Sequence, residues 1–587
     1  MKVSDYVADF IAKLSPRCYT VCGAGAMHLN DSISHHLGIK AIAMHHEQAA
    51  TMAAEADARV TNGIGVVCVT AGPGGTNTLT GLAGAWVDSI PLLVIAGQVT
   101  SSTMMPIFSG WFPHHRPQGM NELPLAEIVR PITKYATSVR AARDIRYCLE
   151  QAVWRAMHGR RGPAWIEIPL DIQNAEVDPQ ELPAFDPPRD GWLLRIEHVD
   201  VDALLEASQP VMIIGNGVRL SGAEDALRRF LDRFQMPVVT SWGARDIIPD
   251  HPCVIGSGGI FGDRASNWAI QNADLILAVG TRLSYPQTGH NRELFAPNAR
   301  KIVVDIDHNE VTKLPGVFPI VADCRKFFEA ALARLRNDNV WTTWLTVCQG
   351  EDGLNPVMLP EYREDKGGIN AYHFIEQLGQ HLADDAIVIT DVGFSFIPTF
   401  QSLKLKPGQR LIHSAGVSPM GWAIPAAVGA AFAAPGRQIV CLTGDGGAMM
   451  NLQELQTIAH HRLPISIFVY ANDGYATMRL TQENHFGRLA VSSPESGVSC
   501  PDFQELAEAF GFPIAGYWLS TNDGLFDAAL HGKKGDHGGL PSLVQLNMAP
   551  NQVIAPRVQS RMENGKFVPT PIDDMWPHRE KVGEAAE

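Results

Sequence analysis

The chain has 587 residues, which is too long for a single hydrophobic core and predicts about three or four compact domains. Hydrophobic residues make up 45% of the sequence and charged residues 19%, a balance typical of globular proteins. The formal net charge of −15 disfavours non-specific binding to nucleic acid, because neutralising phosphates requires clustered lysines and arginines. A phosphate-bearing ligand must therefore be held by local features of the chain.

The first predicted element is an amphipathic helix within residues 1–17, where charged and apolar side chains alternate at helical spacing. This segment lacks an uninterrupted apolar stretch of signal-peptide or membrane length, so we expect a cytoplasmic protein without a membrane partner. The nine cysteines do not show the paired spacing of a zinc site. We expect them to be reduced thiols.

Short apolar runs that end in turn residues recur along the chain and are typical of strands buried on both faces of a sheet. They cover residues 65–75, 91–97, 210–217, 275–282, 301–307, 386–393, 438–447 and 465–473. Helical patterns lie between them, most clearly over residues 47–60, 223–234 and 452–461. The alternation of strand and helix predicts the α/β class, built from doubly wound parallel sheets.

Two stretches are predicted to be linkers, because they are rich in proline, aspartate and glycine or lack strand signals. They lie near residues 176–192 and 340–368. The predicted domains are therefore residues 1–178, 190–335 and 368–550, each an α/β unit, followed by a C-terminal tail over residues 551–587.

The stretch that carries most chemistry begins at a Gly-Asp-Gly-Gly turn between a predicted strand and a helix. Glycines and free N–H groups at a helix start suit a diphosphate, which also needs a cation. Asp445 supplies a carboxylate, and Asn472 supplies an amide oxygen at the end of the next strand; such oxygen ligands suit Mg²⁺. We expect the Gly474 carbonyl as a further ligand. The predicted cofactor-binding residues here are Gly444, Asp445, Gly446, Gly447, Asn472, Gly474 and Tyr475. An isolated Asp-Gly pair is most often a plain turn, but the strand, helix, strand and asparagine in this order favour the metal site.

These two motifs, GDGG and NDGY, resemble the cofactor signature of thiamin-diphosphate enzymes, and residues 44–98 resemble the pyrimidine-binding domain of the acetolactate synthase group. The resemblance implies that Glu47 is the catalytic glutamate, hydrogen-bonded to the aminopyrimidine ring, and that Pro73 and Asn77 line the pyrimidine site. It also implies that Met420 is the apolar residue that wedges between the two rings of the cofactor. The alternatives are a surface glutamate at a helix start and an ordinary core methionine.

Motifs of the middle domain follow, in order, the places where acetolactate synthases hold FAD. The resemblance implies flavin contacts from Arg160, Gly215, Gly217, Gly259, Gly262, Gly280, Thr281, Arg282, Asp305, Ile306 and Asp323. A glycine cluster at a strand end and an acidic residue ending a later strand also suit a dinucleotide. Related decarboxylases keep this domain without flavin, so both states remain open. A bound FAD is expected to have a structural role.

Three stretches point away from branched-chain amino-acid biosynthesis: residues 282–291, 472–487 and 555–580. They resemble the flavin-containing carboligases of the yersiniose-forming type, which add the activated acetaldehyde of pyruvate to a nucleotide-linked ketosugar. The chain also departs from acetolactate synthases, which usually have Gln and His after the Asp-Val-Gly that opens the third domain. Here Phe394 and Ser395 follow, and we expect both at the cofactor.

A histidine pair, His114 and His115, lies where pyruvate-decarboxylase-type enzymes carry a pair that manages protons of the product. A catalytic role and a solvated loop pair are both open.

The resemblance implies an enzyme that decarboxylates pyruvate with thiamin diphosphate and Mg²⁺ and transfers the two-carbon unit to a carbonyl acceptor. The alternatives are an acetolactate synthase, a decarboxylase that releases aldehyde, and a non-catalytic homologue, which the intact Glu47, Asp445 and Asn472 disfavour. In the family the two halves of each active site come from different chains, so a homodimer or homotetramer with shared sites is expected.

Overall fold

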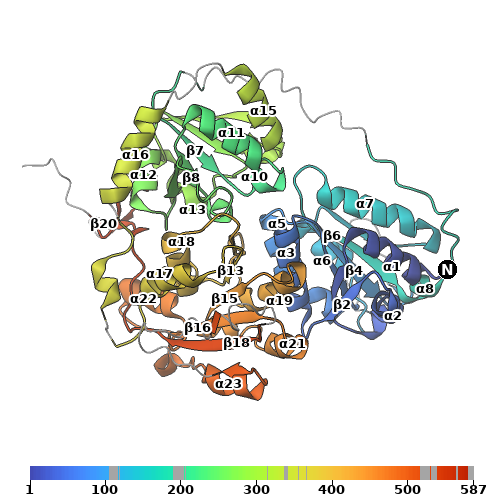
Figure 1. Ribbon diagram of the computed structural model, residues 1–587. Helices are drawn as coiled ribbons and strands as arrows, with labels where there is room; N and C mark the ends of the chain where they lie inside the picture. Colours follow the sequence, from blue (N-terminus) through green and yellow to red (C-terminus); the bar gives the residue numbers. More distant parts are fainter. Residues whose placement is uncertain are drawn as a thin grey trace, which may run out of the picture.

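The computed structural model describes residues 1–104, 117, 119–188, 204, 206–313, 315–335, 341–354, 356–364, 367–515, 529–530, 539–563 and 566–578. Within them the chain forms three six-stranded sheets whose strand pairs are all parallel, which confirms the predicted α/β class. Figure 1 shows one domain around each sheet.

The first domain has the strand order β2-β1-β3-β4-β6-β5. Its strands are β1 (Arg17–Thr20), β2 (Lys40–Ala43), β3 (Gly65–Val69), β4 (Leu92–Gln98), β5 (Tyr135–Ser138) and β6 (Ala164–Pro169). Its helices are α1 (Val3–Leu14), α2 (Met27–His35), α3 (Glu47–Thr61), α4 (Pro73–Thr76), α5 (Leu79–Val87), α6 (Leu125–Val129), α7 (Ile145–Met157) and α8 (Leu170–Asn174). The predicted N-terminal helix is confirmed, because α1 buries Val3, Val7 and Ile11 along one face.

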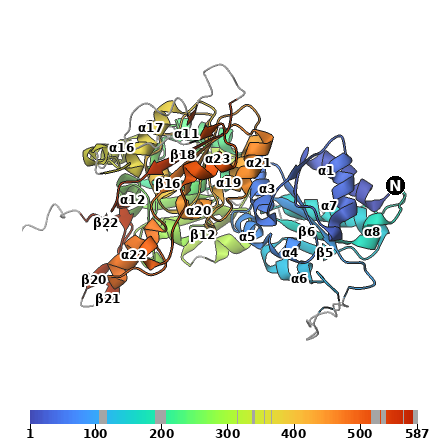
Figure 2. The same ribbon diagram turned by 90° about the horizontal axis from the view of Figure 1, so that it is seen from below.

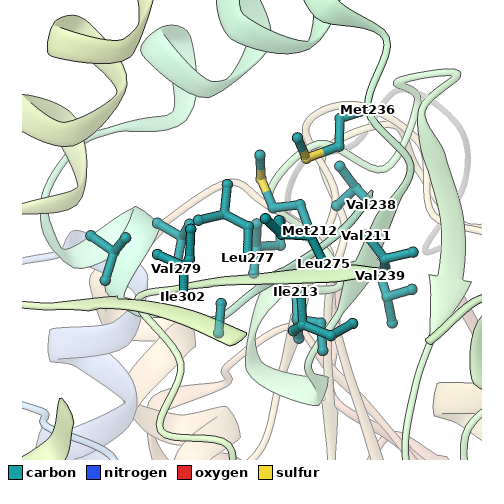
Figure 3. Packing of buried hydrophobic residues seen from close by; sticks show 14 of the residues in the cluster. Val211, Met212, Ile213, Met236, Val238, Val239, Leu275, Leu277, Val279 and Ile302 are labelled. Atoms are coloured by element: carbon teal, nitrogen blue, oxygen red, sulfur yellow. The ribbon is translucent and has the colours of Figure 1, made fainter. Parts of the chain in front are cut away.

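The central domain has the order β12-β11-β10-β7-β8-β9, which is the 3-2-1-4-5-6 order of dinucleotide-binding sheets when its strands are numbered within the domain. Its strands are β7 (Pro210–Ile214), β8 (Val238–Thr240), β9 (Val254–Ser257), β10 (Leu275–Val279), β11 (Arg300–Asp305) and β12 (Val317–Val321). Its helices are α10 (Gly217–Leu220), α11 (Glu224–Phe234), α12 (Arg264–Gln271), α13 (Tyr285–Thr288), α14 (His308–Thr312), α15 (Cys324–Arg334) and α16 (Thr342–Leu354). Figure 3 shows how Val211, Ile213, Leu275 and Leu277 fill the core.

The third domain has the order β14-β13-β15-β16-β18-β17, the same as the first. Its strands are β13 (Ile387–Thr390), β14 (Arg410–Ile412), β15 (Ile439–Gly444), β16 (Ile465–Ala471), β17 (Ile514–Ala515) and β18 (Ser542–Asn547). Its helices are α17 (Ala371–His381), α18 (Ile397–Ser402), α19 (Ala423–Ala433), α20 (Asp445–Ala448), α21 (Glu454–His461), α22 (Ala476–Phe486) and α23 (Phe503–Ala509).

The C-terminal segment returns from the third domain to the central one. It contains the short strands β19 (Arg557–Val558), β20 (Arg561–Glu563), β21 (Lys566–Val568) and β22 (Met575–Trp576), which pair as β19 with β22 and β20 with β21. The Gln401 side chain donates to the Pro556 carbonyl at 2.7 Å, and the Asn267 side chain donates to the Ile572 carbonyl at 2.8 Å. The tail therefore fastens these two domains together.

Every apolar run predicted as a strand forms one, and the helices predicted over residues 47–60, 223–234 and 452–461 correspond to α3, α11 and α21. The predicted linker over residues 340–368 is wrong in part, because it contains α16. Trp344 of this helix is buried against the central domain and donates to the Pro210 carbonyl. Helix α16 therefore extends the central domain beyond its predicted end at residue 335.

Helices α3 and α19 pack against each other at the boundary of the first and third domains, where both views place them side by side (Figures 1 and 2). The contact is close because Gly429 has no side chain: a Cβ there would lie 2.0 Å from the Ala53 carbonyl oxygen. The Trp422 indole, at the start of α19, donates to the buried Glu55 carboxylate at 2.8 Å.

A buried ion cluster joins all three domains. Asp246 of the central domain accepts hydrogen bonds from Arg219 and from Arg410 of the third domain, both at 2.7 Å. Arg410 also donates to the Arg59 carbonyl of the first domain. The two arginines outweigh the effect of burial and lower the pKa of Asp246 to about 2.

All nine cysteines are free thiols. Across the described ranges, no helix combines the length and apolar character needed to cross a membrane.

Candidate functional site

The Gly-Asp-Gly-Gly turn lies where β15 ends and α20 begins. Asp445 is 1% exposed, and its carboxylate accepts N–H hydrogen bonds from Gly446 at 2.8 Å, Asn472 at 2.7 Å and Gly474 at 3.1 Å. A carboxylate has roughly four acceptor positions, so these bonds leave room for one more ligand. Burial raises the pKa of Asp445, which a bound cation would oppose.

Asn472 follows β16, the strand next to β15, so the topology brings the two predicted metal ligands to one edge of the sheet. The Asn472 side-chain nitrogen donates to the Tyr470 carbonyl at 3.1 Å, which leaves the side-chain oxygen for a cation. In the described part of the chain no three His, Cys, Asp or Glu residues form a metal-binding group. The candidate metal ligands at this edge are an aspartate, an amide and backbone carbonyls, and such oxygen donors fit Mg²⁺.

Met420 and Tyr475 converge on Gly446. A Cβ on Gly446 would lie 2.4 Å from the Tyr475 ring and 3.5 Å from the Met420 methyl carbon. A Cβ on Gly444, one residue before Asp445, would have no atom within 4 Å, so this side of the backbone faces open space. The apolar wedge, the turn and the predicted metal ligands therefore share one location, as a bent cofactor would require.

Asp391 at the end of β13 connects these parts, and the sequence did not single it out. Its carboxylate accepts from the Gly421 N–H at 2.9 Å and from the Thr443 hydroxyl at 3.0 Å. A Cβ on Gly447 would lie 2.6 Å from it. Asp391 thus fixes the chain next to Met420 relative to the Asp445 turn, and burial raises its pKa to about 6.

Phe394 and Ser395 lie beside this site, in the turn after β13. Both are buried: Phe394 belongs to a hydrophobic core of the third domain, and the Ser395 hydroxyl donates to the Val392 carbonyl at 3.1 Å. A direct contact of either residue with a cofactor stays a prediction.

The other half of the expected site lies in the first domain. Glu47 begins α3 and is 8% exposed, and its carboxylate accepts a hydrogen bond from the Asn77 side chain at 2.9 Å. Asn77 ends α4, which begins at the exposed Pro73. Gly74 packs so closely that a Cβ there would lie 3.3 Å from the Glu47 carboxylate. Three predicted residues therefore meet at the ends of β2 and β3.

Contacts between the two halves run along α3 within one chain. Arg59 lies over the Trp422 ring at 5.8 Å, and the Asn451 side chain donates to the Gly421 carbonyl and lies 3.8 Å from the Met52 sulfur. Two residues before Glu47, the His45 N–H donates to the Glu454 carboxylate of the third domain at 3.1 Å.

A cavity of about 530 Å³ lies at the junction of the three domains. It opens at the carboxyl ends of β7 and β10, where the strand order of the central sheet reverses and where such sheets bind dinucleotides. Predicted flavin contacts that line it are Arg160, Gly215, Gly217, Gly280, Thr281, Arg282, Asp305, Ile306 and Asp323. Gly259 and Gly262 are not among its lining residues, although Gly258 is.

The backbone at the cavity floor explains two glycines. A Cβ on Gly217 would lie 2.6 Å from the Gly280 Cα, and the Gly217 N–H donates to the Gly280 carbonyl at 3.0 Å. Only glycines allow these two loops to approach so closely. Burial raises the pKa of Asp305, at the end of β11, to about 6. Arg160 reaches toward Asp307 and Glu310 at 3.5 Å.

Two predicted catalytic residues, His114 and His115, lie outside the described residues. Residues that the sequence did not single out are Asp391, Asp246 and the cavity-lining His413. Asp391 follows an apolar strand immediately, the same signal that identified Asp445, and could have been found by it.

Comparisons with known proteins agree with this geometry. Three family models match in order: the N-terminal TPP binding domain of thiamine pyrophosphate enzymes over residues 1–122, their central domain over 200–331, and their C-terminal TPP binding domain over 391–544. The acetolactate synthase large subunit of Lactococcus lactis is 32% identical over 499 residues, covering 83% of each chain. The large subunit of acetolactate synthase isozyme 2 from Escherichia coli is 31% identical over 542 residues, covering 90% of this chain and 92% of its own. The chain therefore belongs to the thiamine-pyrophosphate-dependent enzymes and is an acetolactate synthase-like carboligase of the transferase or lyase type.

Proposed function

We propose that the protein decarboxylates a 2-oxo acid such as pyruvate and joins the remaining two-carbon unit to a carbonyl acceptor. The observation that carries this proposal is the convergence of Asp445, Asn472, Met420 and Tyr475 at the ends of β15 and β16. Thiamin diphosphate, when bound, supplies the electron sink for the bond next to the carbonyl of the 2-oxo acid. Asp445 and Asn472 would hold the Mg²⁺ that neutralises its diphosphate.

Glu47 is the proposed catalytic acid. The Asn77 amide holds its carboxylate at 2.9 Å, and α4 covers it, so the group is fixed in a largely water-excluded position. A carboxyl group in this setting can donate a proton to a ring nitrogen of the cofactor and can accept it back. Phe394 lies where acetolactate synthases have a polar residue, which favours a less polar surrounding for the reacting groups.

The active site is proposed to form across a homodimer, which could further pair into a tetramer. Support comes from the family resemblance, which implies that the two halves of each site come from different chains. Methionines next to the diphosphate half are also unusually exposed: Met449 by 43% and Met450 by 47%. Apolar side chains at the edge of an incomplete site suit burial against a second copy.

The central cavity is proposed to bind one FAD per chain in a structural role. The support is its place at the topological switch point of a sheet with dinucleotide-binding strand order, together with the close Gly217 and Gly280 loops. Purified protein should be yellow, and acid-released flavin should approach one equivalent. Colourless protein that stays fully active would contradict the FAD proposal.

The acceptor is tested by product analysis. Protein supplied with thiamin diphosphate, Mg²⁺ and labelled pyruvate is offered either a second 2-oxo acid or a nucleotide-linked ketosugar. Release of CO₂ with a branched hydroxy product supports the carboligase. The acceptor that gives more of this product shows whether the enzyme uses a 2-oxo acid or a ketosugar. Release of CO₂ with aldehyde alone would show a simple decarboxylase, and no CO₂ release would overturn the proposed function.

A further inference from the structure

Arg479 on α22 is a half-buried arginine that contacts the chain carrying the predicted metal ligands. Its Nη1 donates to the Asp473 carbonyl at 2.9 Å and to the Ser492 carbonyl at 3.2 Å, and its Nη2 donates to the Asn472 carbonyl. Among the residues that the structure describes, Arg479 forms no ion pair with a carboxylate. The guanidinium is therefore used to hold backbone carbonyls.

The backbone that these bonds hold has an unusual conformation. Asp473 has a φ of 57° and Gly474 a φ of 107°, so two consecutive residues lie in the left-handed region. A Cβ on Gly474 would also lie 2.8 Å from the Ser492 carbonyl oxygen, so only glycine fits here. A non-glycine residue such as Asp473 keeps a left-handed conformation only where its surroundings enforce it. This turn therefore needs support from outside its own backbone.

Two side chains give that support, and they use opposite groups of the backbone. Asp445 accepts from the N–H groups of Asn472 at 2.7 Å and Gly474 at 3.1 Å, whereas Arg479 donates to the carbonyls of Asn472 and Asp473. The side-chain nitrogen of Asn472 donates to the Tyr470 carbonyl. Each polar group of Asn472 except the side-chain oxygen thus has a partner. The direction of that oxygen depends on Asp445 and Arg479 together.

The third acceptor, the Ser492 carbonyl, anchors Arg479 to a fixed part of the chain. Ser492 is fully buried, and its carbonyl also accepts from the Tyr475 N–H at 3.0 Å. Its hydroxyl donates to the Gln482 side chain at 2.7 Å, and its N–H donates to the Ser496 hydroxyl at 2.9 Å. The planar fork of a guanidinium can reach three carbonyls at once, which a lysine ammonium on its flexible stem does less well.

We propose that Arg479 is a positioning residue of the metal site. By holding the carbonyls of Asn472 and Asp473, it aims the Asn472 side-chain oxygen and the Gly474 carbonyl at one cation. This inference rests on the proposed thiamin diphosphate and Mg²⁺ site. Mg²⁺ demands nearly ideal octahedral geometry with short bonds, whereas the larger Ca²⁺ accepts irregular sets of oxygen ligands. A loosened turn should therefore disfavour Mg²⁺ more than Ca²⁺.

The test uses metal-free, full-length protein saturated with thiamin diphosphate and titrated with Mg²⁺ or Ca²⁺ in a calorimeter. For Arg479→Gln we expect the dissociation constant of Mg²⁺ to rise roughly ten- to hundred-fold, the usual effect of losing a partner that orients a metal ligand. The dissociation constant of Ca²⁺ should rise about three-fold or less. The ratio of the two constants is the decisive quantity, because a general loss of structure weakens both ions alike. Arg479→Lys, which keeps the charge and a donor, should recover part of the Mg²⁺ affinity.

Arg488→Gln provides the matched control, because Arg488 is an exposed arginine just after α22 and the substitution removes the same charge. It should leave both dissociation constants unchanged. An effect of Arg488→Gln as large as that of Arg479→Gln would overturn the inference by showing that charge alone matters.

The remaining outcomes separate this inference from the proposed function. If wild-type protein binds thiamin diphosphate equally well with and without Mg²⁺, the proposed metal site fails, and the Arg479 inference with it. If wild-type protein requires Mg²⁺ and Arg479→Gln binds both ions normally, only the Arg479 inference is overturned. An equal loss of Mg²⁺ and Ca²⁺ affinity would also overturn it by showing a general structural role. If Arg479→Gln does not fold, the two dissociation constants of Arg479→Lys decide by the same criteria.

Discussion

The central domain and the two outer domains share a six-stranded parallel sheet but differ in strand order and in how complete their sites are. In the central domain the order reverses between β7 and β10, and the cavity there is already enclosed by all three domains of one chain. In the outer domains the order is the same for both, and each carries only half of the expected thiamin site. In the proposed arrangement, the central site is completed within one chain and the thiamin site by a second chain.

The contacts that surround the two kinds of site differ accordingly. Beside the central cavity, charged groups bridge the domains through Asp246 with Arg219 and Arg410. The outer domains meet through the apolar helices α3 and α19, which bury their shared face.

The largest effect is expected from inactivating Glu47 on one chain and Asp445 on another. Glu47→Gln should lower turnover by roughly 10²–10⁴-fold, the usual effect of losing a positioned proton-transfer group, without releasing the cofactor. Asp445→Ala should be inactive because it loses a metal ligand. When the two variants exchange subunits in equal amounts, half of the dimers are mixed and each has one intact site, so about a quarter of wild-type activity should return.

Subunit exchange must be verified with differently tagged chains. Mixing either variant with itself is the control and should restore nothing. Verified exchange without recovered activity would show that each site is built within one chain.

Removing the divalent metal should affect the two cofactors differently. Chelation leaves the Asp445 carboxylate facing a diphosphate, and like charges in contact cost several kcal/mol, so thiamin diphosphate affinity should fall on the order of a hundred-fold or more. FAD affinity should not change, because its proposed cavity relies on backbone groups and Asp305 rather than on a cation. Titration calorimetry with and without Mg²⁺ measures both, and an equal loss for FAD would contradict the assignment of the metal to the outer domain.

Asp246→Asn tests the buried ion cluster that joins the three domains. Removing one partner of a buried ion cluster leaves Arg219 and Arg410 facing each other, and about 3 kcal/mol of stability should be lost. For a unit of this size the thermal midpoint should fall by roughly 6–12 °C. Asp250→Asn, which disrupts the exposed ion pair with Arg228, is the control and should cost less than about 1 kcal/mol.

The pH dependence of this loss has a definite sign. Because the folded pKa of Asp246 is about 2, below its ordinary value of 3.8, the charged carboxylate stabilises the fold. That contribution is complete above the ordinary value and disappears as the pH falls toward 2. The stability difference between wild type and Asp246→Asn should therefore shrink below pH 4, and a constant difference would show that Asp246 acts through packing.

The sequence predicted the sheets well because their strands are continuous apolar runs bounded by turn glycines, as in residues 438–447. The metal ligands were equally accessible, because Asp445 and Asn472 each follow such a run directly. Helix α16 was missed because Gly350 and Gly353 interrupt it and its amphipathic pattern is weak. Its stability depends on burying Trp344 against α12, which only the tertiary structure reveals.

His413 could not be predicted for a related reason. It stands in a loop with no spacing relation to any motif, and its surroundings come from distant parts of the chain: Trp242 of the central domain, Phe396 and Phe400.

The smallest effect is expected from Asp391→Asn, which sharpens the comparison within the third domain. Burial raises the folded pKa of Asp391 to about 6, above its ordinary 3.8, so its ionisation opposes folding as the pH rises through this range. Removing the charge offsets the hydrogen bonds lost, and the stability at pH 7 should change by less than about 1 kcal/mol. The asparagine amide would nevertheless turn a donor toward the Gly421 N–H or the Thr443 hydroxyl and loosen the Met420 segment. Thiamin diphosphate affinity should therefore weaken by roughly three- to ten-fold, a loss of about one hydrogen bond, while FAD affinity stays unchanged.

Asp384→Asn, at an exposed carboxylate paired with Lys406, should change neither affinity. Equal weakening of both cofactors by Asp391→Asn would mean that Asp391 supports the whole domain rather than the turn beside Met420.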